Sequence, residues 1–118
     1  MKNRMGIIIA ALGLLFSGVA ISEDLVVKFV NESGEEHKGV VLIAWTKQGT
    51  KVMDGVRPVP GYGTIPFRLS NCSQYVSWQF LASLKYSDNP DNFDTVLLDT
   101  GKRPVTKCEY TITGKKGN

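Results

Sequence analysis

The longest regular pattern in the chain is an alternation of apolar and polar positions over residues 75–86. Its even-numbered positions are all apolar: Val76, Trp78, Phe80, Ala82, Leu84 and Tyr86. Its odd-numbered positions are mostly polar: Tyr75, Ser77, Gln79, Leu81, Ser83 and Lys85. Because successive side chains of a strand point to opposite faces, this pattern predicts a long strand with one buried face and one solvated face. The buried face needs a second layer of similar size to cover it.

Further strands with the same two-residue period supply that layer. We expect them at residues 25–31, 38–47, 50–56, 64–70, 95–99 and 105–113. The stretch 38–47 is apolar on both faces, which predicts a central strand or one whose outer face meets a partner. Pro66 predicts an edge position or a bulge for residues 64–70, and the prolines and glycines of residues 57–63 predict a connection.

These short strands, with glycine and proline between them, are typical of an all-β domain. The sequence predicts a small antiparallel β-sandwich of six or seven strands. An immunoglobulin-like arrangement is favoured, and a small barrel is the rival. We expect one domain over residues 23–113, followed by a frayed basic tail over residues 114–118.

Residues 1–22 have the three-part pattern of a secretory signal peptide: Lys2 and Arg4, an apolar run, and small residues before a cleavage site after Ala20 or Ser22. An uncleaved anchor over residues 5–21 is the alternative. The sequence therefore predicts a protein exported to the periplasm or the extracellular space, without stable membrane insertion after cleavage. Cleavage after Ser22 leaves 12 basic and 11 acidic side chains, and a net charge of +1 predicts no binding to nucleic acid.

The chain has two cysteines, Cys72 and Cys108, and in an exported protein they are expected to form one disulfide. Cys72 shares even parity with the apolar face of residues 76–86, and Cys108 shares parity with Tyr110 and Ile112. Both sulfur atoms can therefore point inward. The bridge would connect the start of the long strand to the last strand.

Catalytic and metal-binding residues are sparse. His37 is the only histidine, and it lies beside Glu35 and Glu36 in an acidic turn, where we expect it to be solvated. The loop from Asp88 to Asp99 is rich in Asp and Asn, which suggests calcium, but phenylalanine and proline replace residues that an EF-hand needs. A polar hairpin loop explains the same composition. We therefore expect no enzyme activity, no cofactor and no metal site.

Three aromatic residues are candidates for binding. Tyr62 and Phe93 lie in predicted connections, where they can either contact a ligand or fold back to cap the core, and Trp45 lies on the second apolar face of residues 38–47. The leading hypothesis is a non-enzymatic domain that binds another protein or contributes to an envelope or extracellular assembly. The alternative is a small secreted binder or inhibitor whose loop aromatics recognise a protein, sugar or lipid.

Overall fold

The structure of the protein is a computed structural model that describes residues 23–114. The predicted signal peptide and residues 115–118 of the predicted tail lie outside the described residues. The strands are β1 (Leu25–Asn31), β2 (His37–Thr46), β3 (Lys51–Met53), β4 (Arg57–Val59), β5 (Thr64–Leu69), β6 (Tyr75–Ser83), β7 (Val96–Asp99), β8 (Arg103–Pro104) and β9 (Glu109–Gly114). Two single 3-10 turns, Cys72–Gln74 and Pro90–Asn92, interrupt the connections.

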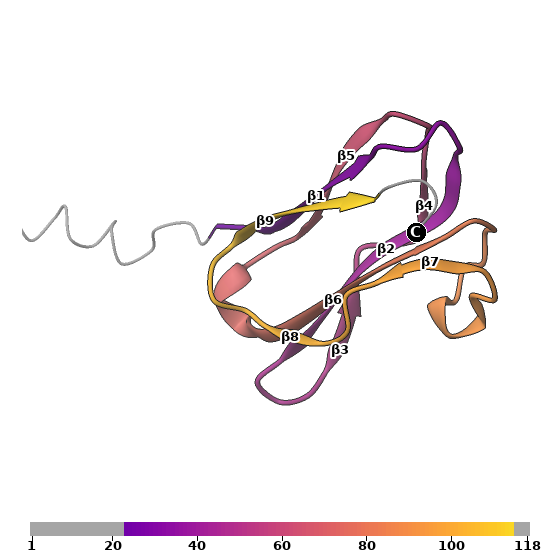
Figure 1. The fold of residues 1–118 in the computed structure, drawn as a ribbon. Helices are drawn as coiled ribbons and strands as arrows, with labels where there is room; N and C mark the ends of the chain where they lie inside the picture. The colour runs from indigo at the N-terminus through magenta and orange to yellow at the C-terminus, as the bar shows by residue number, and fades with distance from the viewer. Residues whose placement is uncertain (1–22, 115–118) are drawn as a thin grey trace, which may run out of the picture.

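The strands form two sheets that pack face to face (Figure 1). One sheet has three strands in the order β5-β1-β9. The other has six, with β3-β2-β6-β7 in order and with β4 and β8 pairing with β2 and β6. The predicted small all-β sandwich is confirmed. Every strand pair is antiparallel except β1 with β9, which is parallel.

The core between the sheets consists of the inward faces of β1, β2, β5 and β6. Phe80 lies at its centre, with its ring centroid 5.3 Å from that of Phe29 and 5.2 Å, edge to face, from that of Phe67. All three rings are fully buried. Aromatic rings at these separations pack favourably and supply a large share of the apolar area in a small core.

The alternation of residues 75–86 is broken at its start by a register shift between β2 and β6. Trp45 is opposite Ser77 and Thr46 is opposite Tyr75, so Val76 has no partner residue on β2. Such an extra residue is a β-bulge, and it makes the side chains before and after it switch between the two faces of the sheet. Tyr75 is therefore buried, with 6% of its surface exposed, whereas Val76 is 45% exposed. The prediction that Val76 belongs to the core face is wrong.

The second face of β6 is also covered, which corrects the prediction that it is solvated. Leu81 and Ser83 are buried, and Leu81 forms a second apolar cluster with Val41 and Ile43 of β2. Phe93, Trp45 and Val56 pack over that cluster. The two-faced apolar pattern of β2 is thereby explained, because the strand is central and has apolar groups on both sides.

The disulfide between Cys72 and Cys108 is confirmed, with 5.9 Å between the two Cα atoms. Next to it, the Tyr110 hydroxyl accepts hydrogen bonds from the backbone N–H groups of Thr106 (2.8 Å) and Lys107 (3.2 Å). Burial raises the pKa of Tyr110, but the contact with the Thr106 hydroxyl (3.3 Å) and these two backbone hydrogen bonds together outweigh burial and bring that pKa below its ordinary value. The bridge and this hydroxyl fix the turn that leads into β9.

Two boundaries differ from the prediction. Residues 57–59, expected in a connection, form the short edge strand β4. Gly114, expected in the tail, is the last residue of β9 and is buried. The edge position predicted from Pro66 is confirmed, because β5 pairs only with β1 in its sheet. Over residues 23–114, no helix has the length and apolar character needed to cross a bilayer.

Candidate functional site

Three connections meet at the end of the sandwich opposite the disulfide, and we call residues 32–36, 60–63 and 84–86 of these connections the loop end. The backbone N–H of Tyr62 donates a 2.9 Å hydrogen bond to the Ser33 carbonyl oxygen, which joins the first two connections. The N–H of Lys38 donates to the Leu84 carbonyl oxygen at 3.3 Å, which brings the third beside the first. Loops held by a rigid sheet scaffold are a common location for binding residues.

Asn31, the last residue of β1, fixes the backbone of the loop end. Its side-chain amide donates hydrogen bonds to the carbonyl oxygens of Glu35 (2.9 Å) and Pro60 (3.1 Å), and its Oδ1 accepts one from the Ser33 N–H (3.0 Å). Only 1% of the surface of Asn31 is exposed. One buried amide therefore satisfies backbone groups of two different connections.

Replacing Asn31 with alanine should lower the free energy of unfolding by about 1–3 kcal/mol, because three buried or part-buried backbone groups lose their partner. Equilibrium urea unfolding measures the change. The matched control is Asn92→Ala, at an exposed asparagine, which should change the stability by no more than about 0.5 kcal/mol. Equal effects of the two substitutions would contradict this role of Asn31.

Tyr62 is the most exposed of the large apolar and aromatic side chains, with 78% of its surface accessible. Its backbone has the left-handed φ of 59°, and a Cβ added to Gly34 would lie only 3.1 Å from its ring. The approach of Gly61 to Gly34 is closer still and leaves no space for a side chain there. The ring of Tyr62 therefore rests on a glycine backbone and projects from a turn whose conformation is fixed.

A cavity of about 480 Å³ lies beside this turn. It is lined by Glu35, Glu36, Lys38, Leu84, Lys85 and Tyr86. The β1–β2 turn connects it to Tyr62, because Gly34 contacts the tyrosine ring and the next two residues line the cavity. The loop end thus presents the exposed ring of Tyr62 and, beside it, a cavity lined by the ring of Tyr86, two carboxylates and two ammonium groups.

Tyr86 is a residue of this surface that the sequence pattern misplaced. The alternation predicted it on the buried face of the long strand, but β6 ends at Ser83 and Tyr86 is 59% exposed. The turn sequence Ser87-Asp88-Asn89-Pro90 follows Tyr86 directly. It is the signal from which an end of the strand before Tyr86 could have been predicted.

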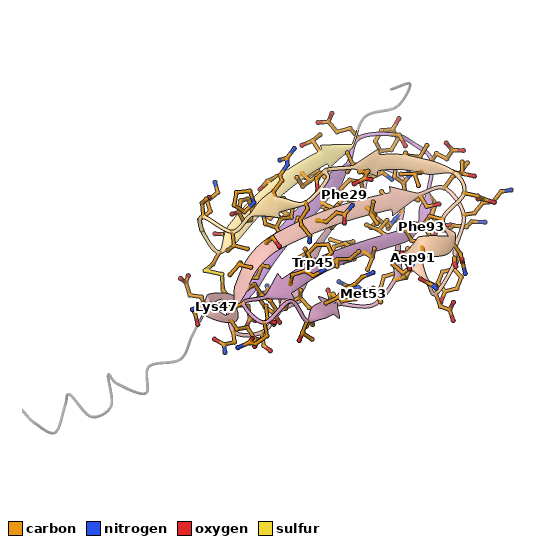
Figure 2. All side chains as sticks on the ribbon, turned by 90° about the horizontal axis from the view of Figure 1, so that it is seen from below. Phe29, Trp45, Lys47, Met53, Asp91 and Phe93 are labelled. Carbon is orange, nitrogen blue, oxygen red and sulfur yellow. A yellow bond between two sulfur atoms is a disulfide. The ribbon has the colours of Figure 1, made fainter. Side chains whose placement is uncertain are left out.

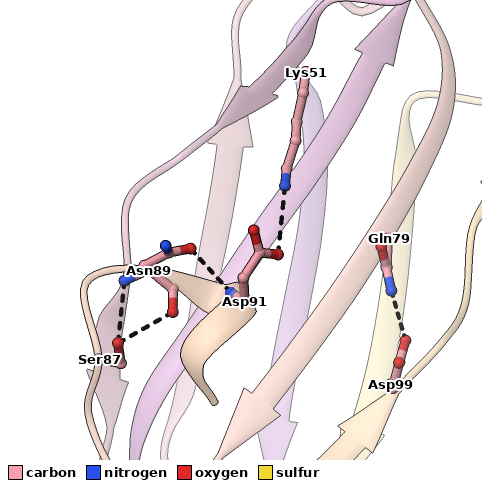
Figure 3. Close-up of polar contacts among 6 residues, drawn as sticks. All are labelled: Lys51, Gln79, Ser87, Asn89, Asp91 and Asp99. Atoms are coloured by element: carbon pink, nitrogen blue, oxygen red, sulfur yellow. Dashed lines mark hydrogen bonds and ion pairs between the residues drawn. The ribbon is translucent and has the colours of Figure 1, made fainter.

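Phe93 lies elsewhere, on the outer face of the six-stranded sheet. It is half-buried, and its ring packs over the cluster of Val41, Ile43 and Leu81 (Figure 2). A Cβ on Gly39 would come within 3.2 Å of this ring. The segment that carries it is held by an ion pair of 3.9 Å between Asp91 and Lys51 of β3 (Figure 3). Phe93 thus covers buried residues on the outer face of the six-stranded sheet.

Trp45 shares the outer face with Phe93 and Met53 (Figure 2). It is half-buried against the same cluster, and Lys102 Nζ lies 4.1 Å from the centroid of its ring. A cation over an indole face is a favourable contact. The face of β2 that carries Val41, Ile43 and Trp45 is therefore not an open apolar patch, because its two aliphatic residues are buried.

The remaining candidates from the sequence do not converge. His37 is buried, with its ring centroid 5.9 Å from that of Phe29, so the prediction of a solvated turn residue is wrong. Within residues 23–114, no group of three or more His, Cys, Asp or Glu side chains is placed to hold a metal ion. Asp99 accepts hydrogen bonds at 2.8 Å from both Gln79 Nε2 and the Gly101 N–H (Figure 3 shows the first).

No protein-family model matches the chain, and comparisons with curated proteins and with solved structures gave no match. Function is therefore inferred from the surfaces of this molecule alone.

Proposed function

We propose that the chain is an exported, non-enzymatic β-sandwich domain that binds another protein through its loop end. The observation that carries the proposal is the position of Tyr62, which is 78% exposed on a turn with fixed geometry. A rigid tyrosine contributes contact area with little loss of conformational entropy on binding. Because the ring projects from the surface, a partner with a large surface of its own can bury it, whereas a small ligand would leave most of it in water.

The charges at the loop end fit the same proposal. Two acidic side chains, Glu35 and Glu36, and two basic ones, Lys38 and Lys85, line the cavity together with Tyr86. An interface with an aromatic centre and a polar rim is the usual composition of specific protein complexes. The structure favours this end over the face of Val41 and Ile43, where side chains of the protein itself already cover the apolar cluster.

Export and the lack of an enzymatic role rest on separate observations. The disulfide supports a non-cytoplasmic compartment, either the periplasm or the extracellular space. The one histidine packs against Phe29 inside the sandwich, away from solvent. General acid-base chemistry needs titratable groups that converge on an accessible point.

Tyr62→Ala should weaken partner binding by about 2 kcal/mol or more, which is about a 30-fold increase in Kd, without lowering the unfolding midpoint appreciably. The partner is first isolated by affinity capture on the immobilised wild-type protein and identified by mass spectrometry. Binding is then measured by titration calorimetry, and the midpoint by urea unfolding.

Phe93→Ala is the matched control and should have the opposite effect. It removes an aromatic ring from the cover of a buried cluster, so it should lower the free energy of unfolding by about 1–2 kcal/mol, less than for a fully buried ring. Binding per folded molecule should stay at the wild-type value. If Tyr62→Ala also reduces only stability, the loop end is not the binding surface.

A further inference from the structure

The free edges of the two sheets differ in their protection against pairing with another strand. In the six-stranded sheet the edge strands are short, β4 and β8 contain Pro58 and Pro104, and β7 has a register shift against β6. In the other sheet, Pro66 lies within β5 and its carbonyl oxygen accepts a 3.1 Å hydrogen bond from Arg57 Nη2. Such features prevent edge-to-edge association. Among the described strands, β9 is the one six-residue edge strand with neither a proline nor a register shift.

The hydrogen bonds of β9 show which of its backbone groups face outward. The Cys108 carbonyl oxygen accepts from the Val26 N–H at 2.8 Å, and the Gly114 carbonyl oxygen accepts from the Glu32 N–H at 2.7 Å. Successive residues of a strand direct their N–H and C=O groups to opposite sides. The even-numbered residues of β9 therefore face β1, and the odd-numbered residues direct their donors and acceptors to the open edge.

We propose that this open edge pairs with the same edge of a second copy of the chain, antiparallel, about a two-fold axis at Thr111. In this register each Thr111 exchanges both of its backbone hydrogen bonds with Thr111 of the other copy, and Glu109 does the same with Thr113. All of these residues belong to the odd-numbered set. Their N–H and C=O groups therefore face the other copy and are not already bonded to β1. The product is one continuous sheet through two molecules, and the interface is isologous.

The side chains of β9 are compatible with a second copy in this register. Glu109, Thr111 and Thr113 are all exposed on one face of the strand. The proposed register sets threonine opposite threonine and glutamate opposite threonine, both compatible cross-strand pairs. A slip that centred the axis on Glu109 would instead oppose two carboxylates, which is destabilising. The register centred on Thr111 therefore keeps the two Glu109 carboxylates apart and pairs all three outward-facing residues of each copy.

The dimer leaves the loop end free. β9 runs from the disulfide to Gly114, whose carbonyl oxygen is bonded to Glu32 at the loop end. Because the two copies of β9 are antiparallel, the two loop ends lie at opposite ends of the dimer. Each copy can therefore bind a partner independently of the other.

The proposal is tested by placing a charge of either sign at Thr111 and measuring dimerisation of the purified protein by sedimentation equilibrium. Wild type should dimerise, and Thr111→Lys and Thr111→Glu should each weaken the dimer at least about tenfold, because each sets like charges opposite each other at the axis. An equimolar mixture of the two variants should restore dimerisation as a mixed species, and added salt should weaken it.

Thr64→Lys is the matched control, at an exposed threonine on β5, the other edge of the same sheet, and it should leave the dimer intact. Circular dichroism of each variant should match wild type, since all of these side chains lie at the surface. Wild-type protein that stays monomeric at about 1 mM overturns the proposal. A dimer that Thr111→Lys does not weaken also overturns it, because such a dimer would use another surface.

Discussion

Replacing Phe80 with alanine should lower the free energy of unfolding by about 3–5 kcal/mol. The ring is fully buried and contacts the rings of Phe29 and Phe67 from the opposite sheet. Its removal leaves a cavity that the surrounding strands, fixed by their hydrogen bonds, can close only in part. Urea unfolding followed by tryptophan fluorescence measures the loss, and the slope of the transition should stay at the wild-type value.

Val76→Ala is the control from the same strand and the same sequence parity. Because the register shift turns Val76 outward, this substitution should change the stability by no more than about 0.5 kcal/mol. If Val76→Ala lowered the free energy of unfolding by several kcal/mol, Val76 would belong to the core and the bulge would be contradicted.

Removing the disulfide should have an effect of similar size. Cys108→Ser should lower the free energy of unfolding by about 2–5 kcal/mol, as is usual when a small exported domain loses a bridge. The closed loop spans a sequence separation of 36 residues, for which restriction of the unfolded chain gives about 4 kcal/mol. All three strands on one side of β2 in the six-stranded sheet, β6, β7 and β8, lie within this loop.

Chemical reduction of the wild-type protein is the control for that substitution. It should lower the unfolding midpoint to the value of Cys108→Ser, and the reductant should not affect the variant. Thiol labelling of denatured wild-type protein, before reduction, should find no free cysteine. Two reactive thiols in the wild-type protein, or a variant as stable as wild type, would contradict the role of the bridge.

The elements that were predicted correctly are those whose signal is local. The alternation predicted β1 and β5 as strands, because the two-residue period of a strand depends only on its own backbone, and their inward residues Val27, Phe29 and Phe67 are buried. Pro66 indicated an edge strand because its nitrogen has no hydrogen to donate. With two cysteines in the chain, only one intramolecular pairing was available.

The errors occurred where a residue's environment depends on a partner segment. The exposure of Val76 results from a register shift, which involves β2 as much as β6. Ser83 is buried although its own pattern is polar, and His37 is buried although it follows two glutamates. No rule based on neighbouring residues along the chain contains the contacts that bury these side chains.

The loop aromatics show the same division most clearly. Tyr62 and Phe93 both follow turn-forming residues, and the sequence treats them alike. In the structure, an apolar cluster lies beneath Phe93, whereas the backbone of Gly34 lies beneath Tyr62. The sequence by itself determined two apolar layers and one bridge, because periodicity and cysteine count are properties of the chain. Only the tertiary structure decided which aromatic ring is exposed and which sheet edge is open, because both depend on what the fold brings alongside.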